Sequence, residues 1–175
     1  IINGSKFYRF YSILIISCDK NNFKITPDVF TIWMRLLTQV TGSVLWLFES
    51  NMTIQRNLRW EAQKRNVDPE RLVFAPRMSL QEHLARHRRA DLGLDTFYCN
   101  AHTTASDALW AGLPVLTCLG NTFAGRVAAS LLHAVGLPEL VTYSHEAYES
   151  LALNLATNPD TLAATKRKLA QNRST

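Results

Sequence analysis

The sequence predicts an α/β fold in which helices wrap a doubly wound, mainly parallel sheet. Short apolar runs alternate with longer amphipathic segments along the chain, which is the pattern of strands connected by helices. With 175 residues, of which 47% are hydrophobic, the chain can bury one compact core. A sheet of this kind binds ligands at the carboxyl ends of its strands, where helix N-termini point at the site.

Six apolar runs are expected to form strands. They span residues 12–17, 43–48, 72–74, 90–94, 115–118 and 140–142. The first run precedes Cys18 and also imitates a lipoprotein signal, in which a small residue and a cysteine follow a short apolar stretch. The strand is preferred because this stretch is much shorter than a membrane span. Residues 12–175 are therefore assigned to one domain, and residues 1–11, which start without Met, to a truncation scar or a disordered lead-in.

The first expected helix has signals at both ends. Thr26 is typical of an N-cap, Pro27 of the first turn, and Asp28 of the positive end of the helix dipole. Gly42 is expected to stop the helix. Its buried stripe is expected to consist of Val29, Phe30, Trp33, Leu36, Leu37 and Val40.

A capping box and two glycine stops mark the later helices. Ser79 and Glu82 form the capping box that opens one helix. Two further helices are expected to stop at Gly112 and Gly136, each of which has a proline two residues beyond it. The spans expected for the last four helices are 104–111, 122–135, 145–156 and 159–172.

The chain is basic, with 19 Lys and Arg against 14 Asp and Glu, a net charge of +5 and a pI near 9.3. A basic balance suits polyanionic partners, but the phosphates of a small ligand satisfy it as well as nucleic acid does. The basic residues are scattered along predicted helix faces, which is typical of a solvated surface. We therefore expect neither a nucleic-acid partner nor a membrane.

The cysteines argue against a disulfide framework and against a zinc site. Cys18, Cys99 and Cys118 are odd in number, lie far apart in the sequence and form no CxxC motif. This usage fits a reducing compartment, and the expected location is the cytoplasm.

The most informative stretch is a strand, a polar loop and a helix that begins at two threonines, within residues 94–117. The backbone N–H groups of the first helical turn and the hydroxyls of Thr103 and Thr104 can together hold phosphates without a metal ion. From these residues alone, a threonine that merely caps the helix is the favoured interpretation, because threonine is an ordinary cap.

Three motifs carry a resemblance to a known family. They are His102-Thr-Thr-Ala-Ser-Asp-Ala-Leu-Trp-Ala-Gly-Leu-Pro114, with Phe74-Ala-Pro76 before it and Gly125-Arg-Val-Ala-Ala-Ser130 after it. This pattern resembles the C-terminal catalytic lobe of the O-GlcNAc transferase and SPINDLY family, from about Cys18 to the end of the chain. The resemblance implies a GT-B glycosyltransferase, in which two Rossmann-like lobes face each other across a cleft. It also implies a preceding N-terminal lobe and tetratricopeptide repeats, which this sequence does not contain.

The resemblance implies roles for residues near the diphosphate and the sugar. Lys24 matches a catalytic lysine that contacts the diphosphate and stabilises the leaving group, whereas its position alone is typical of a solvated loop lysine. Asn21 matches a side-chain amide near the diphosphate. Cys99 and His102 match loop positions that face the sugar and the diphosphate, next to the threonine pair.

Further residues are implied to bind the nucleoside. His83 matches a histidine that packs on or bonds the uracil base, and the backbone near Met78 matches a segment that reads the base edge. Asp107 matches a carboxylate that accepts hydrogen bonds from the ribose hydroxyls, although an acid near a helix start also has a dipolar explanation. Leu80 stands where animal enzymes carry a lysine directed toward the ribose, so that contact is missing here.

By this resemblance, a Ser or Thr hydroxyl of a protein or peptide displaces UDP from a UDP-sugar, most simply UDP-GlcNAc, with inversion. No metal and no cofactor are expected. The general base and the residues that bind the acceptor are expected mostly in the other lobe or from the substrate itself. This chain alone is therefore expected to be inactive. Three alternatives stay open: a relative that uses GDP-fucose or UDP-glucose, a non-catalytic nucleotide-binding or interaction module, and a UDP-sugar epimerase, for which the sequence shows no convincing pair of carboxylates.

Overall fold

The computed structural model describes residues 24–173 of the chain. The first half contains helix α1 (Pro27–Gln39), strand β1 (Leu45–Phe48), helix α2 (Met52–Lys64), the 3-10 turn η2 (Pro69–Arg71), strand β2 (Leu72–Ala75) and helix α3 (Leu80–His87). The second half contains β3 (Gly93–Leu94), α4 (Thr103–Ala111), β4 (Val115–Cys118), η3 (Phe123–Gly125), α5 (Val127–Ala134), η4 (Pro138–Leu140), β5 (Val141–Thr142), α6 (His145–Thr157) and α7 (Pro159–Asn172). The strand expected at residues 12–17 and the lead-in at residues 1–11 lie outside the described residues.

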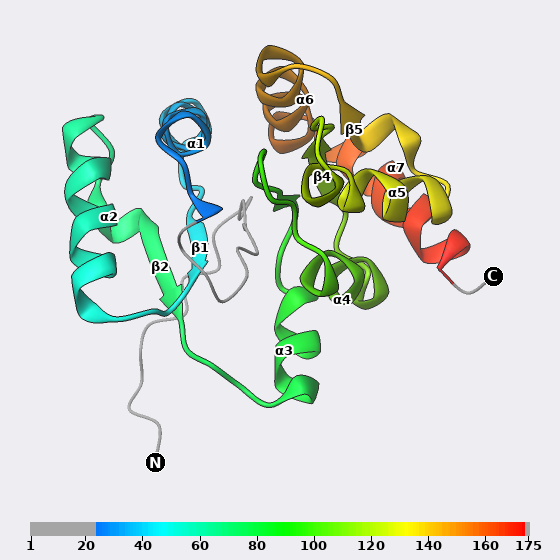
Figure 1. Ribbon diagram of the computed structural model, residues 1–175, viewed down its shortest axis with the longest axis horizontal. Helices are drawn as coiled ribbons and strands as arrows, with labels where there is room; N and C mark the ends of the chain where they lie inside the picture. Colours follow the sequence, from blue (N-terminus) through cyan, green and yellow to red (C-terminus); the bar gives the residue numbers. More distant parts are fainter. Residues whose placement is uncertain (1–23, 174–175) are drawn as a thin grey trace.

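All strand pairs of the described chain are parallel, which confirms the predicted α/β class. β1 pairs with β2 in one sheet, and β3, β4 and β5 pair in that order in a second. Figure 1 shows α1 and α2 beside the first sheet and α4 to α7 around the second, with α3 next to α4. Because the strands within each sheet run the same way, their carboxyl ends lie at one edge, and the loops that follow them share that edge.

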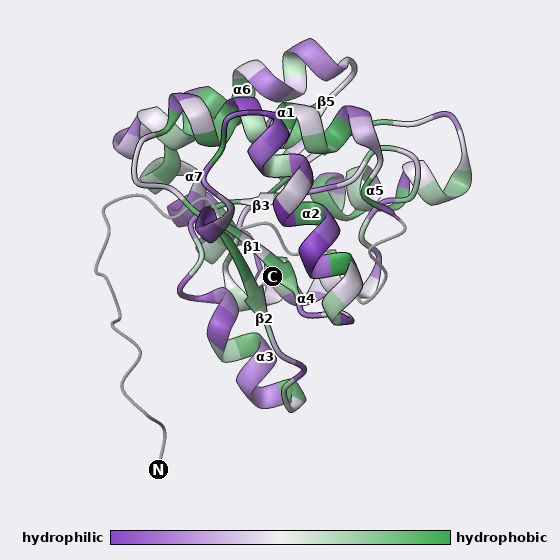
Figure 2. Ribbon diagram, turned by 90° about the vertical axis from the view of Figure 1, so that its left-hand side faces the viewer, coloured by the Kyte–Doolittle hydropathy of each residue, from purple (hydrophilic) through white to green (hydrophobic). Residues whose placement is uncertain are grey.

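Apolar side chains of α1 form much of the core. All six members of the predicted stripe are buried, with Val40 the most exposed at 6%. Strand β4 is buried along its whole length, as expected for a strand covered on both faces. In Figure 2, β1 and β2 are coloured as hydrophobic, whereas α2 and α3 alternate between hydrophilic and hydrophobic residues because one face of each helix meets water.

The predicted helix signals hold at most ends. Ser79 and Glu82 form a capping box in which each side chain bonds the other residue's backbone N–H. Gly112 and Gly136 close α4 and α5 with φ angles of 91° and 68°, a left-handed conformation that favours glycine. Thr26 occupies the predicted N-cap position of α1, but its hydroxyl donates to the Asp28 carboxylate and caps no backbone N–H.

The helix predicted over residues 122–135 is wrong in its first turn. The Thr122 hydroxyl accepts from the N–H of Gly125 and closes the separate 3-10 turn η3, and α5 begins only at Val127. Gly120 donates to the Gly125 carbonyl at 2.7 Å, and a Cβ atom on either glycine would lie 3.2 Å from the Cα atom of the other. The strands expected from residues 43 and 90 also begin later, at Leu45 and Gly93.

None of the helices within residues 24–173 combines the length and the apolar character that a membrane crossing requires.

Candidate functional site

The N-terminus of α4 lies at the carboxyl edge of the second sheet. Residues 95–102 lead from the end of β3 to Thr103, the first residue of α4. His102 provides no side-chain cap among the described residues, whereas Asn51, Ser79 and Ser144 cap α2, α3 and α6. The first N–H groups of α4 and the positive end of its dipole are therefore available to an anion.

The two threonines at this helix start are placed differently. Thr103 is exposed, and Thr104 is half-buried. The Thr104 hydroxyl is buried and has no hydrogen-bond partner among the described residues. A buried hydroxyl without a partner is costly, so an oxygen acceptor at the start of α4 would relieve this cost. This donor set of amides and hydroxyls fits a phosphate group.

Lys24 lies against the same loop although it is far away in the sequence. Its ammonium group donates to the backbone carbonyl of Asn100 at 3.1 Å. Asn100 is two residues before His102, so the structure brings the cation to the loop that leads into α4. The position of Lys24 relative to the start of α4 and the role of the lysine both stay predictions.

Contacts within residues 95–102 and with the turn η3 fix the positions of Cys99 and His102. The Thr96 hydroxyl donates to the carbonyl of Cys99 at 2.7 Å. The His102 ring contacts the Ala124 carbonyl at 3.4 Å and lies edge-on to the ring of Phe123, which is 82% exposed. Both predicted residues therefore share one loop, beside the exposed aromatic side chain of η3.

His83 and Asp107 face each other across the contact between α3 and α4. The Nε2 atom of His83 lies 3.9 Å from a carboxylate oxygen of Asp107. Arg86 donates to Nδ1 of His83 at 2.8 Å and to the Pro76 carbonyl at 2.9 Å. Because Nδ1 accepts a bond, a neutral His83 carries its proton on Nε2, toward Asp107.

The position of Asp107 argues against the explanation that this acid merely interacts with the helix dipole. No acidic residue lies in the first turn of α4, and Asp107 is four residues beyond Thr103. Dipole effects fall off within the first turn, so they account poorly for a carboxylate at this place.

The remaining predicted residues are less closely connected to this group. Met78 lies on the segment between β2 and α3 and is 43% exposed. Leu80, at the start of α3, is 65% exposed. Asn21 lies outside the described residues, so its predicted place near the diphosphate has no structural counterpart here.

Burial shifts the pKa of two groups, Asp95 at the start of the loop and His87 on α3. Burial raises the pKa of Asp95 to about 6, although hydrogen bonds from Ala101, Thr117 and Thr96 and the charge of Lys24 act in the opposite direction. Burial also lowers the pKa of His87, whose ring packs edge-on against His83 with the centroids 4.4 Å apart. His87 contacts His83, and Asp95 bonds Ala101, the residue before His102.

The sequence motifs do not identify the polar residues that support the site. Asp95 follows β3 immediately, and an acid directly after a buried strand at the ligand edge could have drawn attention to it. Arg86 is one of the scattered basic residues, and its bond to His83 could not be read from the sequence.

Within residues 24–173, no group of three or more His, Cys, Asp and Glu side chains is arranged to hold a metal ion. The groups that converge at the start of α4 are N–H donors, hydroxyls and an ammonium. Binding without a metal ion stays a prediction.

Comparison with known proteins agrees with the sequence motifs. The family model "Glycosyl transferase family 41" matches residues 1–175. A Caenorhabditis elegans protein named "UDP-N-acetylglucosamine–peptide N-acetylglucosaminyltransferase" is 37% identical over 163 residues, which are 93% of this chain and 14% of the relative. A Petunia hybrida protein named "Probable UDP-N-acetylglucosamine–peptide N-acetylglucosaminyltransferase SPINDLY" is 33% identical over 156 residues, which are 86% of this chain and 17% of that protein.

A solved structure has the same fold. The structure of a "Thermobaculum terrenum O-GlcNAc transferase mutant" superposes with a TM-score of 0.87 at 30% identity, and the match covers 97% of this chain and 33% of that chain. The chain thus spans about a seventh of the C. elegans relative and a third of the solved bacterial chain.

Proposed function

This chain belongs to glycosyltransferase family 41, and we propose that it forms the donor-binding half of an inverting transferase that moves a sugar from a UDP-sugar to Ser or Thr of a protein. The observation that carries this proposal is the meeting of a cation and a helix start at one loop. Lys24 bonds the Asn100 carbonyl, and the uncapped first turn of α4 begins three residues later. An ammonium and a set of backbone N–H groups are the groups that stabilise a diphosphate without a metal ion.

The separation of Thr103 and Asp107 along α4 supports a second subsite for the ribose. Asp107 follows Thr103 by four residues, which corresponds to about 6 Å along a helix. The diphosphate and the ribose of a nucleotide are neighbouring groups on this scale. We assign the diphosphate to the start of α4 and the ribose to the Asp107 carboxylate. His83 and the backbone near Met78 would then contact the base.

The same arrangement suggests how this half contributes to the reaction. As the acceptor hydroxyl attacks the anomeric carbon, negative charge grows on the β-phosphate of the departing UDP. Lys24, Thr103 and Thr104 would stabilise that charge, and loss of one such preorganised donor commonly lowers the rate by about 10²–10³-fold. Cys99 and His102, on the adjoining loop, would face the sugar. We assign the general base to none of the described residues.

The proposal is tested by calorimetry with this chain, in EDTA, against UDP-GlcNAc, UDP-glucose and GDP-fucose. We expect UDP-GlcNAc to bind. Lys24→Met should weaken binding, because the diphosphate loses its cation, whereas the matched variant Lys168→Met should not, because Lys168 pairs with Glu139 on the surface.

The outcomes separate the alternatives. Binding of GDP-fucose alone would change the assigned donor, and equal effects of the two lysine variants would remove Lys24 from the site. Absence of binding to all three nucleotides would refute the proposed function.

A further inference from the structure

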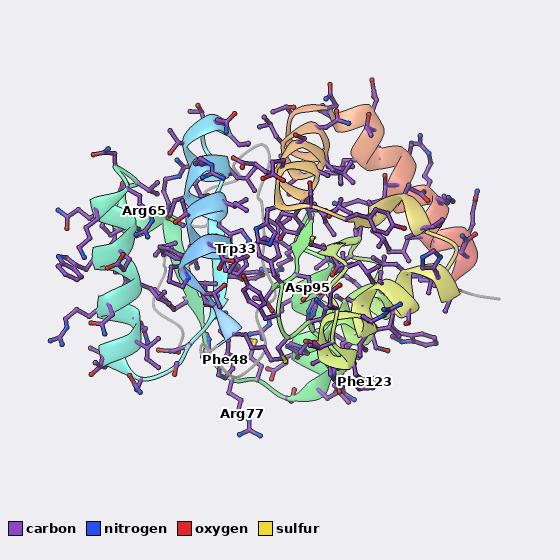
Figure 3. The ribbon with its side chains drawn as sticks, turned by 45° about the horizontal axis from the view of Figure 1, so that its top comes forward. Trp33, Phe48, Arg65, Arg77, Asp95 and Phe123 are labelled. Carbon is purple, nitrogen blue, oxygen red and sulfur yellow. The ribbon has the colours of Figure 1, made fainter. Side chains whose placement is uncertain are left out.

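One buried carboxylate holds both ends of the loop that leads into α4. Asp95 is 2% exposed, and its Oδ1 atom accepts from the N–H of Thr96 at 2.8 Å and from the N–H of Ala101 at 2.7 Å. Its Oδ2 atom accepts from the Thr117 hydroxyl of β4 at 2.7 Å. A single side chain thus closes residues 95–101 into a fixed loop and attaches this loop to the neighbouring strand. Figure 3 shows Asp95 in the interior, whereas Phe123 and Arg77 lie at the periphery.

The loop held by Asp95 carries the groups assigned to the donor site. The N–H of Asn100 donates to the Ala124 carbonyl at 2.8 Å, and its side-chain amide donates to the Thr96 carbonyl at 2.8 Å. The carbonyl of Asn100 accepts from Lys24. The orientation of this carbonyl, and with it the place of the ammonium, therefore depends on the loop that Asp95 closes.

Burial makes a carboxylate at this place costly. Desolvation opposes the charged form of a fully buried acid, and an apolar side chain would avoid that cost. Two groups act on Asp95 from packed elements: the charge of Lys24, and the Tyr148 hydroxyl, which donates to the Asp95 carbonyl at 2.9 Å. A costly ionisable group directly behind a binding loop is typical of a site under functional constraint.

We propose that Asp95 is a positioning residue, whose bonds to the N–H groups of Thr96 and Ala101 fix the loop that presents the α4 N-terminus and Lys24 to the donor diphosphate. Asp95 does not touch the donor. It acts through the geometry of the loop, as supporting residues around other sites do. This inference rests on the proposed function, because it concerns the same site.

The test measures UDP-GlcNAc affinity together with thermal stability. Asp95→Ala removes all three acceptor bonds and should weaken binding on the order of tenfold in the folded protein, as loss of supporting residues does elsewhere. Asp95→Asn keeps an oxygen that can accept from both N–H groups, and it should restore most of the affinity. The control Asp91→Ala removes a carboxylate that pairs with Lys166 instead, and it should leave the affinity unchanged.

A second pair of variants serves if Asp95→Ala does not fold. Thr117→Val removes the hydroxyl that fixes Oδ2 but keeps the shape of this fully buried side chain, whereas Thr117→Ser keeps the hydroxyl. We expect Thr117→Val to bind UDP-GlcNAc more weakly than Thr117→Ser, with faster hydrogen exchange at the Ala101 amide.

The possible failures are distinguishable. If the wild-type chain binds UDP-GlcNAc and the folded variants of Asp95 or Thr117 bind it equally well, Asp95 supports only the fold and the inference is wrong. If the wild-type chain does not bind, the proposed function fails and this inference fails with it.

Discussion

At the scale of single residues, Asp107 offers the most direct test of the nucleoside subsite. Its carboxylate is a quarter exposed and lies beyond the first turn of α4, so it can accept from ribose hydroxyls. A hydrogen bond to a charged group contributes about 1.5–3 kcal/mol. We therefore expect Asp107→Ala to weaken UDP binding by roughly tenfold or more in calorimetry, with little change in melting temperature.

The matched control for this prediction is Asp160→Ala, because Asp160 is an exposed acid in the first turn of α7. It should lose only a dipole interaction and leave UDP binding intact. If Asp107→Ala unfolds the chain while its folded fraction binds UDP normally, Asp107 has a structural role and our assignment is wrong.

Asp95 predicts a pH dependence of folding stability. Burial raises its pKa in the folded chain to about 6, above the ordinary aspartate value of 3.8. The folded state therefore holds this proton more tightly than the unfolded state does. The stabilising effect of the proton is present below pH 4 and is lost as the pH rises to about 6, by on the order of 3 kcal/mol.

This dependence is measured by urea unfolding of the wild type and Asp95→Asn between pH 4 and pH 8. The free energy of unfolding of the wild type, relative to the variant, should fall as the pH rises to about 6 and then level off. The other titrating groups largely cancel in this difference. A difference that does not vary with pH would mean that Asp95 titrates normally.

At the scale of elements, the helix boundaries were predictable where local chemistry sets them. The stripe of α1 follows from side-chain spacing, and the capping box at Ser79 from two residues of one turn. The separate turn η3 could not be predicted, because it depends on the contact between Gly120 and Gly125. The pattern of residues 122–135 is typical of a continuous helix. The structure alone shows that α5 begins only at Val127.

The same distinction applies to the site. The motif at His102 and Thr103 is contiguous, so its residues could be named from the sequence through the family resemblance. The bond of Lys24 to Asn100 joins residues 76 positions apart, and Asp95 gains its role from bonds to Ala101 and Thr117. Partners that meet only in the folded chain leave no periodic pattern in the sequence.

The end of α4 allows a test of how its last turn is closed. Gly112 has a φ of 91°, and a Cβ atom there would lie 2.9 Å from the Arg173 guanidinium, which bonds the Trp110 carbonyl. Gly42 also has a positive φ, 79°, but a Cβ atom there would meet nothing within 4 Å. Each change to alanine should cost about 1–2 kcal/mol in backbone strain.

We expect Gly112→Ala to lower the free energy of unfolding by more than Gly42→Ala does, because it also displaces Arg173. Urea unfolding of the two variants measures this difference. Equal losses would show that the Arg173 contact contributes nothing to closing α4.

At the scale of the whole molecule, the two sheets are connected through side chains behind the site. The indole of Trp33 on α1 donates to the Tyr148 hydroxyl on α6 at 3.3 Å, and Tyr148 in turn donates to the Asp95 carbonyl. Near the site, the Tyr98 hydroxyl donates to Asp28 at 2.9 Å, which ties the loop before α4 to the start of α1. A ligand held by both Lys24 and α4 would therefore stabilise both sheets together.

This coupling predicts a global rise in melting temperature when a UDP-sugar binds. A ligand at a hundred times its dissociation constant stabilises the folded state by about 2.7 kcal/mol. For a chain of this size, each kcal/mol raises the melting temperature by about 2–4 °C, so UDP-GlcNAc should raise it by roughly 5–10 °C in one cooperative transition.

Because the proposed site uses amides, hydroxyls and an ammonium, the shift should be the same in EDTA as in Mg²⁺. Differential scanning calorimetry measures it, with ADP-glucose as the control for base recognition. A shift that requires Mg²⁺ would contradict metal-free binding, and stabilisation of only part of the transition would mean that the donor contacts one sheet alone.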